Sequence, residues 1–495
     1  MHFTLINPPF EFCCESDLIF SQCLGILSIA SYVQEHGHKV TVIDALHEGR
    51  NIQEITPEGL LRIGLKNHEI VDRIPSYTDL IGVSGPFSHL ALTCHKLIDK
   101  IKGSLNYVPV VFGGVYPSTQ PRLAVQSQAD YLVIGEGELP IAELLDYLRN
   151  GKTGPLPKGV AATSHLETLE SVSPNRVENL DTIPPPDRAF LPFKEYIIRS
   201  QRNALAGRTA TIITSRGCPF DCEFCSVHPV CGYSWRPRSA ALVLAEIDML
   251  VDKYQVNNIE IEDDNFTLNK SRALDILQGI IERNRRGKRI SWIAPNGIRI
   301  DTLDDELMQA IAQSNCMRMN IALEHGDKDV LRSMNKKLDL DRALDVARLV
   351  NKYKIPCSVF IIYGYPGETR LRFENAVAFY SRMKAIAPKI DFICLIAQPY
   401  PGTKLYERMV SEGFLPADMF STVEKIPRFS TIDAIWIETP DFNKKEVKRR
   451  GELLNKELAN SAYYRAKLKN MLPQSAIVYA RKLYHLWKRS ISTNI

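Results

Sequence analysis

Short runs of β-branched and apolar residues alternate with longer amphipathic segments through the first 150 residues. We interpret the short runs as five strands, each followed by a helix-length segment: Phe3–Asn7, Lys39–Asp44, Leu80–Ser84, Val108–Phe112 and Tyr131–Ile134. Strands that alternate with helices form parallel sheets with helices on both faces. The pattern therefore predicts a doubly wound, Rossmann-like α/β domain over residues 1–150.

The same alternation returns after a proline-rich interval, residues 151–205, which we predict to be a linker. Six further strands are expected, again separated by helix-length segments: Thr209–Thr214, Ile259–Glu262, Ile290–Ala294, Met317–Leu323, Cys357–Tyr363 and Phe392–Ala397. Six βα repeats curl into an open barrel whose active site lies at the carboxyl ends of the strands. We predict a partial (β/α)6 barrel over residues 206–410 and a mainly helical, basic region over residues 411–495.

The loops that follow the first five strands are where ligands bind in such sheets. Two of these loops are rich in glycine, Gly113–Gly114 and Gly135–Glu138. Glycine allows a backbone to approach a bulky ligand closely, which favours a nucleotide-like or tetrapyrrole-like guest over a metal ion. The alternative is that these glycines only form turns.

The charge of the chain is unevenly distributed. The net charge is +4, but residues 441–495 hold 13 Lys and Arg against 4 Asp and Glu, a balance of +9, and the remainder holds 48 against 53, a balance of −5. Such a tail could meet an anionic lipid surface, a phosphate-bearing substrate or an acidic partner, or it could be a solvated helical face. The domain bodies lack interleaved basic and aromatic residues, so no nucleic-acid partner is expected.

The tail also carries an apolar stripe at helical spacing, with Lys and Arg interleaved: Ala476, Ala480, Leu483, Tyr484 and Trp487. This pattern is typical of a helix that lies on a membrane surface, and equally of a helix that docks on the protein body. Peripheral membrane contact would direct attention to a lipid or a hydrophobic tetrapyrrole as substrate.

The chain has no apolar run of about 18 residues and no basic segment followed by an apolar stretch at its start. We therefore expect a cytoplasmic protein without a signal peptide. Eleven cysteines are present, and their clustered spacing favours metal or redox chemistry in a reducing compartment over disulfides.

Three of the cysteines, Cys218, Cys222 and Cys225, lie directly after the first predicted barrel strand. Three thiolates on one short loop can hold an iron–sulfur cluster, and because such clusters usually take four cysteines, one iron would stay open for a substrate or cosubstrate. A structural zinc site that adds His228 or Cys231 is the alternative. Outside the triplet, we expect Cys231, Cys316, Cys357 and Cys394 to serve core packing rather than radical chemistry.

The spacing C-x3-C-x2-C, with Phe224 before the last cysteine, resembles that of the radical S-adenosylmethionine (SAM) superfamily. Four later barrel loops also resemble that family: Glu262–Thr267, Ala322–Gly326, Tyr363–Thr369 and Pro399–Thr403. With the N-terminal motifs given below, the resemblance covers residues 1–410. It implies a [4Fe–4S] cluster on the three cysteines, an open iron that binds SAM, and an external electron donor of the flavodoxin or ferredoxin type.

The resemblance also implies roles for residues at the strand ends. SAM or substrate contacts fall on Asp263, Asp264, Asn265 and Glu324, although such residues can also simply hold loops together. The adenine would lie beside a backbone shaped by Gly364, Pro366 and Gly367. Phe224 would shield the cluster or bring its neighbouring backbone to the adenine.

The N-terminal segments Leu24–Leu27, Glu35–His38, Gly113–Gly114 and Gly135–Glu138 resemble the cobalamin-binding domain of the B12-dependent branch of this superfamily. This resemblance implies cobalamin contacts at Pro8, Ser84, Gly113, Gly114, Gly135 and Glu136. Glu136 and Glu138 are also suited to stabilise the loop and the N-terminus of the following helix.

A cobalt-binding histidine is missing from the loop where many cobalamin folds carry D-x-H-x-x-G. That loop reads Asn7-Pro8-Pro9-Phe10-Glu11, and the similar stretch Asp44–Gly49 follows the second strand instead. Two hypotheses follow: cobalamin binds without histidine ligation, or the domain kept the fold and lost the ligand.

The resemblance favours methyl transfer to an unactivated carbon of a small natural product, lipid or tetrapyrrole, driven by a 5′-deoxyadenosyl radical. The same architecture also serves cyclisation, rearrangement or oxidation without cobalamin. A non-catalytic iron–sulfur or zinc scaffold is the third hypothesis.

Overall fold

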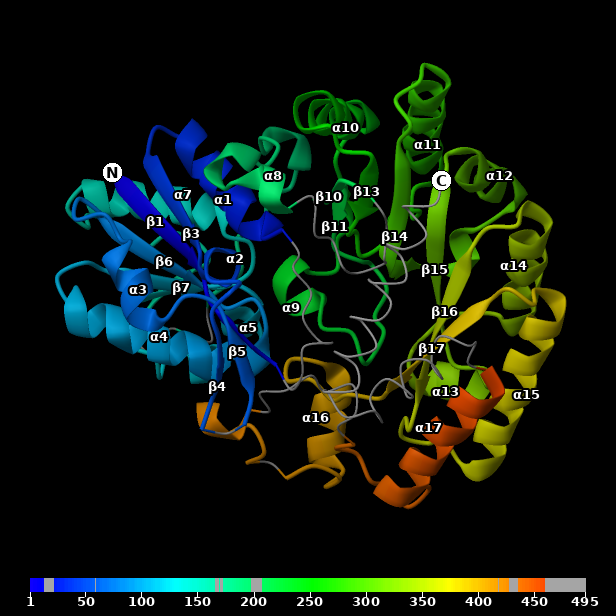
Figure 1. The fold of residues 1–495 in the computed structure, drawn as a ribbon. Helices are drawn as coiled ribbons and strands as arrows, with labels where there is room; N and C mark the ends of the chain where they lie inside the picture. The colour runs from blue at the N-terminus through cyan, green and yellow to red at the C-terminus, as the bar shows by residue number, and fades with distance from the viewer. Residues whose placement is uncertain are drawn as a thin grey trace, which may run out of the picture.

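The computed structural model describes residues 1–12, 22–57, 59–164, 169, 172–196, 207–416, 418–426 and 435–458. Two six-stranded sheets lie side by side, the first in blue and cyan and the second in green and yellow (Figure 1). The α/β class predicted from the sequence is confirmed, and so are a Rossmann-like first sheet and a barrel-like second one.

The first sheet has the strand order β3-β1-β6-β7-β8-β9. Its five parallel strands match the predicted ones: β1 (His2–Asn7), β3 (Lys39–Asp44), β6 (Leu80–Ser84), β7 (Val110–Gly113) and β8 (Tyr131–Val133). The sixth, β9 (Val160–Ala162), pairs antiparallel with β8. This strand falls within the predicted linker, so part of that segment belongs to the sheet.

Both faces of this sheet are covered by helices. Helix α4 (Ala91–Ser104) packs on one face through Leu97 and Ile98, which belong to one apolar cluster. Helices α1 (Leu24–Glu35) and α7 (Glu138–Arg149) pack on the other face through a second cluster that includes Val33 and Leu144. Because the chain passes from β1 to β3 and then returns to the far side of β1 with β6, the sheet is doubly wound.

The second sheet keeps its strands in chain order: β10 (Thr209–Ile212), β13 (Asn258–Ile261), β14 (Ser291–Ile298), β15 (Cys316–Glu324), β16 (Cys357–Tyr363) and β17 (Asp391–Ile396). All neighbours are parallel. Helices on the outside follow the strands: α10 (Ala240–Tyr254), α11 (Lys270–Arg285), α12 (Asp305–Gln313), α14 (Leu340–Tyr353) and α15 (Arg370–Ile386). This arrangement is the predicted open barrel.

Several short strands were not predicted from the sequence. Three form a small antiparallel sheet beside the first domain: β2 (Phe10–Phe12), β5 (Leu61–Ile63) and β4 (Gln53–Ile55). Two more, β11 (Ser215–Arg216) and β12 (Arg236–Pro237), pair on either side of the cysteine loop. Runs of two or three residues are too short to show an alternating pattern.

The region after residue 411 contacts both domains. The turn η7 (Val423–Lys425) places Val423 in an apolar cluster of the first domain. Helix α17 (Lys444–Leu458) places Val447 and Leu454 in the core of the barrel. Within the part of the chain that the structure describes, no helix is long and apolar enough to cross a membrane. The amphipathic stripe over residues 476–487 lies outside the described residues.

Candidate active site

The cysteine triplet lies on the loop between β11 and the short helix α9 (His228–Cys231), and in Figure 1 α9 lies between the two sheets. Cys218, Cys222 and Cys225 are free thiols, each partly exposed. Burial raises the pKa of Cys222 above its usual value and raises that of Cys225 to about 12. Metal binding requires thiolates, so loading a metal or a cluster here would release protons.

Residues between the cysteines hold this loop across the mouth of the barrel. The amide of Asn335 donates to the Asp221 carbonyl at 2.7 Å, and Lys404 Nζ lies 2.5 Å from Asp221 Oδ2. The Glu223 backbone N–H donates to the Met334 carbonyl at 3.0 Å. The loop is therefore fixed to the segments that follow α13 (Lys328–Ser333) and β17, opposite the strand from which it starts.

The three residues after β13 have different environments. Asp263 is buried, and its carboxylate accepts hydrogen bonds from the Thr214 N–H and hydroxyl and from the Ser215 hydroxyl, at 2.5 to 2.6 Å. Asp264 accepts one hydrogen bond from the Gly217 N–H at 3.0 Å. Burial raises the pKa of both aspartates. Asp263 thus holds the start of the cysteine loop, which is the structural role that the sequence left open.

Asn265 is the third of these residues and is 1% exposed. Its backbone carbonyl accepts a hydrogen bond from the Trp235 indole at 3.0 Å. Neither its side-chain Oδ1 nor its Nδ2 has a hydrogen-bond partner among the described residues. A buried amide without partners is costly, so this side chain is suited to a bound polar group.

A cavity of about 590 Å³ opens inside the barrel mouth. This size is within the range of small-molecule sites. Its lining includes the predicted residues Phe224 and Glu324. The other lining residues come from β14 to β17 and from the segment that follows β17: Pro295, Asn296, Asn320, Ala322, Phe360, Ile362, Ile393, Leu395, Ile396, Ala397, Gln398 and Tyr400.

Glu324 ends β15 with a left-handed backbone, φ +68°. Its Oε1 lies 3.0 Å from Lys336 Nζ, and both side chains are nearly buried. Because the two charges offset each other, the pair adds little net charge to the cavity. Among the described residues, the Lys336 contact is made by Oε1 alone, and this arrangement is compatible with the predicted contact of Glu324 to SAM.

The loop Gly364–Thr369 after β16 does not line the cavity. The N–H of Gly364 donates to Glu368 Oε2 at 2.7 Å, and a Cβ on Gly364 would lie 3.0 Å from Val447 of α17. Gly364 and Gly367 both have positive φ, and Pro366 between them is buried. These three residues do shape the backbone, and the predicted adenine contact stays a prediction.

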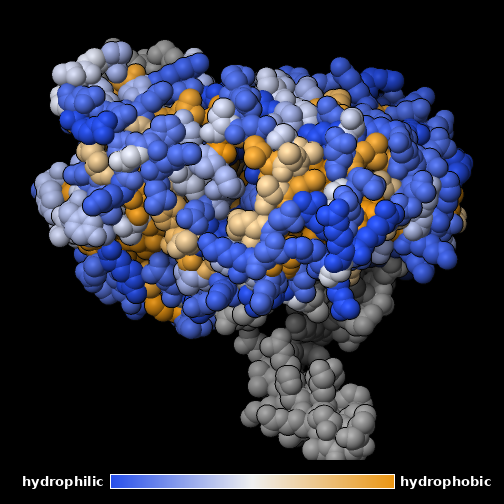
Figure 2. All heavy atoms as spheres, turned by 90° about the horizontal axis from the view of Figure 1, so that it is seen from above, coloured by the Kyte–Doolittle hydropathy of each residue, from blue (hydrophilic) through white to orange (hydrophobic). Residues whose placement is uncertain are grey.

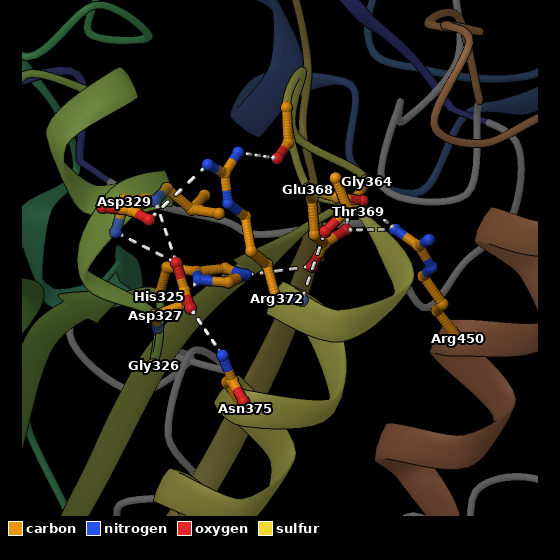
Figure 3. A network of polar contacts seen from close by, with 12 residues as sticks. His325, Gly326, Asp327, Asp329, Gly364, Glu368, Thr369, Arg372, Asn375 and Arg450 are labelled. Atoms are coloured by element: carbon orange, nitrogen blue, oxygen red, sulfur yellow. Dashed lines mark hydrogen bonds and ion pairs between the residues drawn. The ribbon is translucent and has the colours of Figure 1, made fainter.

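Glu368 is the centre of a buried network at this edge of the barrel (Figure 3). Its Oε1 lies 2.9 Å from His325 Nε2, and its Oε2 lies 2.9 Å from Arg450 Nη1. Glu368 is 0% exposed and Arg450 1%. The Asp327 N–H donates to His325 Nδ1 at 3.0 Å. The network therefore ties the loops after β15 and β16 to α17, which is far away in the sequence.

The carboxyl edge of the first sheet is close-packed at its glycines. The Gly85 N–H donates to the Gly113 carbonyl at 2.7 Å. Gly114 has φ +111°, and a Cβ there would lie 2.8 Å from the Gly85 carbonyl oxygen. A Cβ on Gly135 would lie 2.8 Å from Pro174 Cβ. The space beside Gly114 and Gly135 is thus used by the protein itself, and contact of Gly113, Gly114 and Gly135 with cobalamin stays a prediction.

The remaining predicted contacts at this edge are Pro8 and Ser84. Pro8 follows β1 and is buried, and Ser84 ends β6 half-buried. Asn7, beside Pro8, donates its side-chain amide to Asp44 Oδ1 at 2.8 Å. The edge also exposes two apolar side chains on neighbouring loops, Phe87 and Val115. In Figure 2, hydrophobic atoms gather near the middle of the displayed face, with hydrophilic atoms around them.

Glu136 and Glu138 join the two domains. Both carboxylate oxygens of Glu136 accept from Arg236 of β12, at 2.9 and 2.5 Å, and Glu138 Oε1 accepts from Arg216 of β11 at 2.6 Å. Burial alone would raise the pKa of Glu138, but the Arg216 guanidinium brings it below its usual value. We predicted Glu136 as a cobalamin contact; the structure instead commits its carboxylate to Arg236, and contact through its backbone stays a prediction.

Helix contacts bring the same two edges together. Helix α5 (Val115–Thr119), which follows Gly114, packs against α9. A Cβ on Gly402, in the loop after β17, would lie 3.3 Å from Thr119 Cβ. The cysteine loop is therefore in contact with the loops at the carboxyl edge of the first sheet.

The histidines offer no metal site in the described residues. His228 Nε2 is 3.3 Å from the Cys218 carbonyl oxygen. His47, in the stretch that resembles D-x-H-x-x-G, is buried, with its ring stacked on Tyr196 at 3.6 Å. No group of three His, Cys, Asp or Glu in the described ranges converges as ligands of a single ion would.

The other cysteines of the barrel lie in or against its core. Cys357 is 3% exposed and belongs to the core, and Cys316 and Cys394 pack against it. Burial raises the pKa of Cys316 and Cys394 to about 12. These cysteines are placed as packing residues, as the sequence led us to expect.

Comparison with known proteins identifies both domains. The family model of the radical SAM superfamily matches residues 212–380, and that of the B12 binding domain matches residues 21–145. An uncharacterised methyltransferase of Pyrococcus horikoshii is 30% identical over 400 residues, covering 79% of each chain. This chain belongs to the radical SAM superfamily, in its B12-binding branch.

One further relative and one solved structure match over both domains. Cytidylyl-2-hydroxyethylphosphonate methyltransferase of Streptomyces wedmorensis is 25% identical over 425 residues, covering 79% of this chain and 78% of the relative. The structure of the radical SAM methyltransferase TsrM from Kitasatospora setae, with cobalamin and a [4Fe–4S] cluster bound, matches with a TM-score of 0.62 at 18% identity. That match covers 83% of this chain and 78% of TsrM, and it shows a shared fold.

Membership in this branch implies a [4Fe–4S] cluster, SAM and cobalamin, and the described residues fit the first two. Three free thiols on one loop are the donor set of a cluster with one open iron. Glu324 lines the cavity, and the buried side-chain amide of Asn265, after β13, has no partner among the described residues. Cys218, Cys222 and Cys225 would hold the cluster, and Asn265 and Glu324 would orient SAM.

In the first domain, the feature that fits cobalamin is apolar surface at the carboxyl edge of the sheet, not a histidine ligand. Phe87 and Val115 expose apolar surface on neighbouring loops at the carboxyl edge, and a corrin ring has a broad apolar face. The loop after β1 has no histidine, and His47 is covered by Tyr196. The arrangement supports cobalamin bound without a histidine ligand from these two segments.

Sequence reasoning missed several residues that the fold brings to the cavity. Asn296 lies near the end of β14, Asn320 lies within β15, and Gln398 follows β17. A signal existed for Asn320, since an amide in the middle of an otherwise apolar parallel strand is unusual in a buried position. Asn296 and Gln398 carried no such signal, because polar residues at strand ends are common.

Proposed function

We propose that this protein is a cobalamin-dependent radical SAM methyltransferase that acts on an unactivated carbon of a small molecule. The observation that carries the proposal is the contact between the cysteine loop and the carboxyl edge of the first sheet, through α9 against α5 and Glu136 on Arg236. Methyl transfer from cobalamin to a substrate radical requires the two cofactors to face one substrate, and a shared junction provides this.

The residues of the chain have distinct tasks in this proposal. When bound, the cluster and SAM supply the 5′-deoxyadenosyl radical and cobalamin supplies the methyl carrier. Cys218, Cys222 and Cys225 leave one coordination position open, while Glu324 and Asn265 orient the SAM molecule. The apolar wall from β16 and β17 excludes water from the radical. Asp263 and Glu136 fix the loop that carries the cysteines.

The test begins with protein purified without oxygen, with its cluster rebuilt. Hydroxocobalamin is added in excess, the protein is desalted, and bound cobalamin is measured by absorbance. We expect stoichiometric cobalamin and, with reductant and SAM, formation of both S-adenosylhomocysteine and 5′-deoxyadenosine. Protein reconstituted without cobalamin is the control and should form only 5′-deoxyadenosine.

Other outcomes separate the remaining hypotheses. An intact cluster with no retained cobalamin would contradict the proposal and favour radical cyclisation, rearrangement or oxidation. No cleavage of SAM by reduced, cluster-loaded protein would favour a non-catalytic scaffold. Formation of 5′-deoxyadenosine without S-adenosylhomocysteine, in the presence of bound cobalamin, would also contradict methyl transfer.

We also propose that a flavodoxin-type or ferredoxin-type protein delivers the electron and that the basic segment over residues 476–489 contacts anionic lipid. The charge pattern of the tail supports the second proposal. Co-sedimentation with phosphatidylserine vesicles would be compared for the native chain and for a variant with Arg481, Lys482, Lys488 and Arg489 changed to Gln. Equal pelleting would contradict lipid contact.

A further inference from the structure

The barrel cavity is layered along its strands. Alternate residues of β15, β16 and β17 face it, because side chains alternate between the two faces of a strand. Ala322 is paired with Phe360, and Phe360 with Ile393, in a middle layer that is apolar. Above it, towards the mouth, lie Glu324, Ile362 and Leu395. Below the apolar layer, the cavity lining contains Asn320.

In the side-chain amide of Asn320, Nδ2 has a hydrogen-bond partner and Oδ1 has none among the described residues. Its Nδ2 donates to the Pro295 carbonyl at 2.8 Å. Its Oδ1 has no hydrogen-bond partner among the described residues, although the residue is only 7% exposed. Rotating the amide by half a turn would set Oδ1 against the Pro295 carbonyl oxygen, so the orientation is fixed by chemistry. The cavity therefore lacks one hydrogen-bond donor at this position.

SAM is not placed to supply that donor. Asn320 precedes Glu324 by four residues, which is about 13 Å along an extended strand. The cysteines, Phe224 and Glu324 lie at the mouth, where SAM reaches the open iron. A donor for Asn320 must come from a molecule that extends past the apolar layer towards the amino ends of the strands.

The lining also limits the charge of that molecule. Of the described residues that line the cavity, Glu324 is the only charged one, and its partner is Lys336 at 3.0 Å. Neither Lys nor Arg is among these lining residues. An anionic group in this apolar layer would have no cation to pair with and would lose its hydration, which is unfavourable.

We propose that Asn320 binds the substrate, and that the part of the substrate inside the barrel is an uncharged apolar body with one hydroxyl or amide N–H that donates to Asn320 Oδ1. The inference rests on the proposed function in taking the occupant to be the substrate. Any phosphate or carboxylate of the substrate would have to lie outside this cavity.

The test uses three probes that share one apolar body: octan-1-ol, methyl octyl ether and octyl phosphate. Each is titrated calorimetrically into the full chain loaded with cluster and SAM. We expect octan-1-ol to bind about fivefold more tightly than the ether, which cannot donate a hydrogen bond. Octyl phosphate should bind at least about tenfold more weakly than the alcohol.

The variant Asn320→Leu removes the acceptor and keeps a similar side-chain volume. It should abolish the preference for the alcohol over the ether. Asn296→Leu makes the same change at another lining residue, whose exposed amide donates to the Glu262 carbonyl, and it should keep that preference. The comparison of alcohol and ether on the native chain needs no variant, so it tests the inference even if Asn320→Leu fails to fold.

Equal binding of alcohol and ether by the native chain would overturn the inference, as would an alcohol preference that persists in Asn320→Leu, or binding of octyl phosphate as tight as that of octanol. The same preparations are assayed for 5′-deoxyadenosine and for bound cobalamin. If the protein forms 5′-deoxyadenosine and binds cobalamin but shows no preference for the alcohol, the inference about Asn320 is wrong and the proposed function stands. An alcohol preference without SAM cleavage or cobalamin defeats the proposed function while the cavity assignment stands.

Discussion

The two sheets of this protein use the same parallel βα pattern but present their carboxyl edges differently. In the first sheet, the edge is close-packed, with Gly85 and Gly114 in mutual contact and apolar surface exposed beside them. In the second, the edge surrounds a cavity of about 590 Å³. One edge offers an outer surface for a large flat ligand, and the other encloses small ones.

Strand order accounts for this difference. In the first sheet, the order in which strands are added reverses between β1 and β6. Helices therefore cover both faces, and a ligand can bind only outside the strand ends. The second sheet keeps chain order, so all its crossover helices lie on one side and the other side becomes an interior. The comparison teaches that similar local patterns give different kinds of site when the order of pairing differs.

The largest effect is expected from a cysteine ligand in the barrel. Cys222→Ala should abolish 5′-deoxyadenosine formation, because two thiolates do not hold a stable [4Fe–4S] cluster. Cobalamin bound by the first domain should be unchanged, since that edge contributes no cluster ligand. Product is measured by chromatography, and cobalamin by absorbance after desalting.

Cys231→Ala is the matched control for this variant, because Cys231 lies on the same segment outside the triplet. It should keep its iron content and its SAM cleavage. Loss of iron in Cys231→Ala would instead favour a four-cysteine site. Persistent 5′-deoxyadenosine in reconstituted Cys222→Ala would show that the cluster assignment is wrong.

An intermediate effect is expected from the network that fixes the barrel loops. Arg450→Met leaves the Glu368 carboxylate buried without its cationic partner, and breaking such a pair destabilises proteins by about 3 to 5 kcal/mol. Because Glu368 also accepts from Gly364, the KM for SAM should rise more than kcat falls. Denaturant unfolding and steady-state cleavage of SAM measure the two effects.

Arg449→Met controls for the loss of a positive charge on the same helix. Arg449 is paired with Glu446 at the surface, so its removal should change stability by no more than about 0.5 kcal/mol. If the two variants are equally stable, the buried network does not hold the loop. If KM for SAM is unchanged in a destabilised Arg450→Met, the network serves folding alone.

The smallest effect is expected at the edge of the first sheet. Gly114→Ala introduces a Cβ at φ +111° against the Gly85 carbonyl, and should lower stability by about 2 kcal/mol. Gly103→Ala, in the last turn of α4 with open space around it, should be neutral or stabilise by up to about 1 kcal/mol. Thermal unfolding of cluster-loaded protein with and without cobalamin measures both.

This comparison separates two reasons for the glycine. If Gly114 serves the packing of the protein, Gly114→Ala loses stability in the absence of cobalamin as well. If stability is unchanged without cobalamin and only cobalamin binding is lost, the glycine serves the ligand, and the contrast between the two edges is weaker than we describe.

Much of the fold followed from the sequence, because long parallel strands and amphipathic helices carry strong local patterns. All eleven predicted strands are present, with ends that differ by a few residues. Strands β2, β4, β5, β9, β11 and β12 were missed, since two or three residues show no periodicity. The cysteine triplet was found because its spacing is itself the chemical signal.

The roles of the carboxylates could not be assigned in the same way. Asp263 and Glu136 stand in motif loops, yet Asp263 holds the Thr214 backbone and Glu136 pairs with Arg236, which is 100 residues away in the chain. A sequence gives the residue types near a strand end but not the partner that each side chain finds. Long-range pairs of this kind depend on how the two domains meet.

The sequence by itself determined two βα domains, the order in which they occur and the loop that carries the cluster ligands. Those features depend on local periodicity and on spacing within one loop, which the chain encodes directly. Only the tertiary structure decided which edge encloses a cavity, that Arg450 secures Glu368, and that Asn320 lines the cavity with its Oδ1 buried and without a partner among the described residues. These depend on strand order and on contacts between distant segments, which arise only when the whole chain has folded.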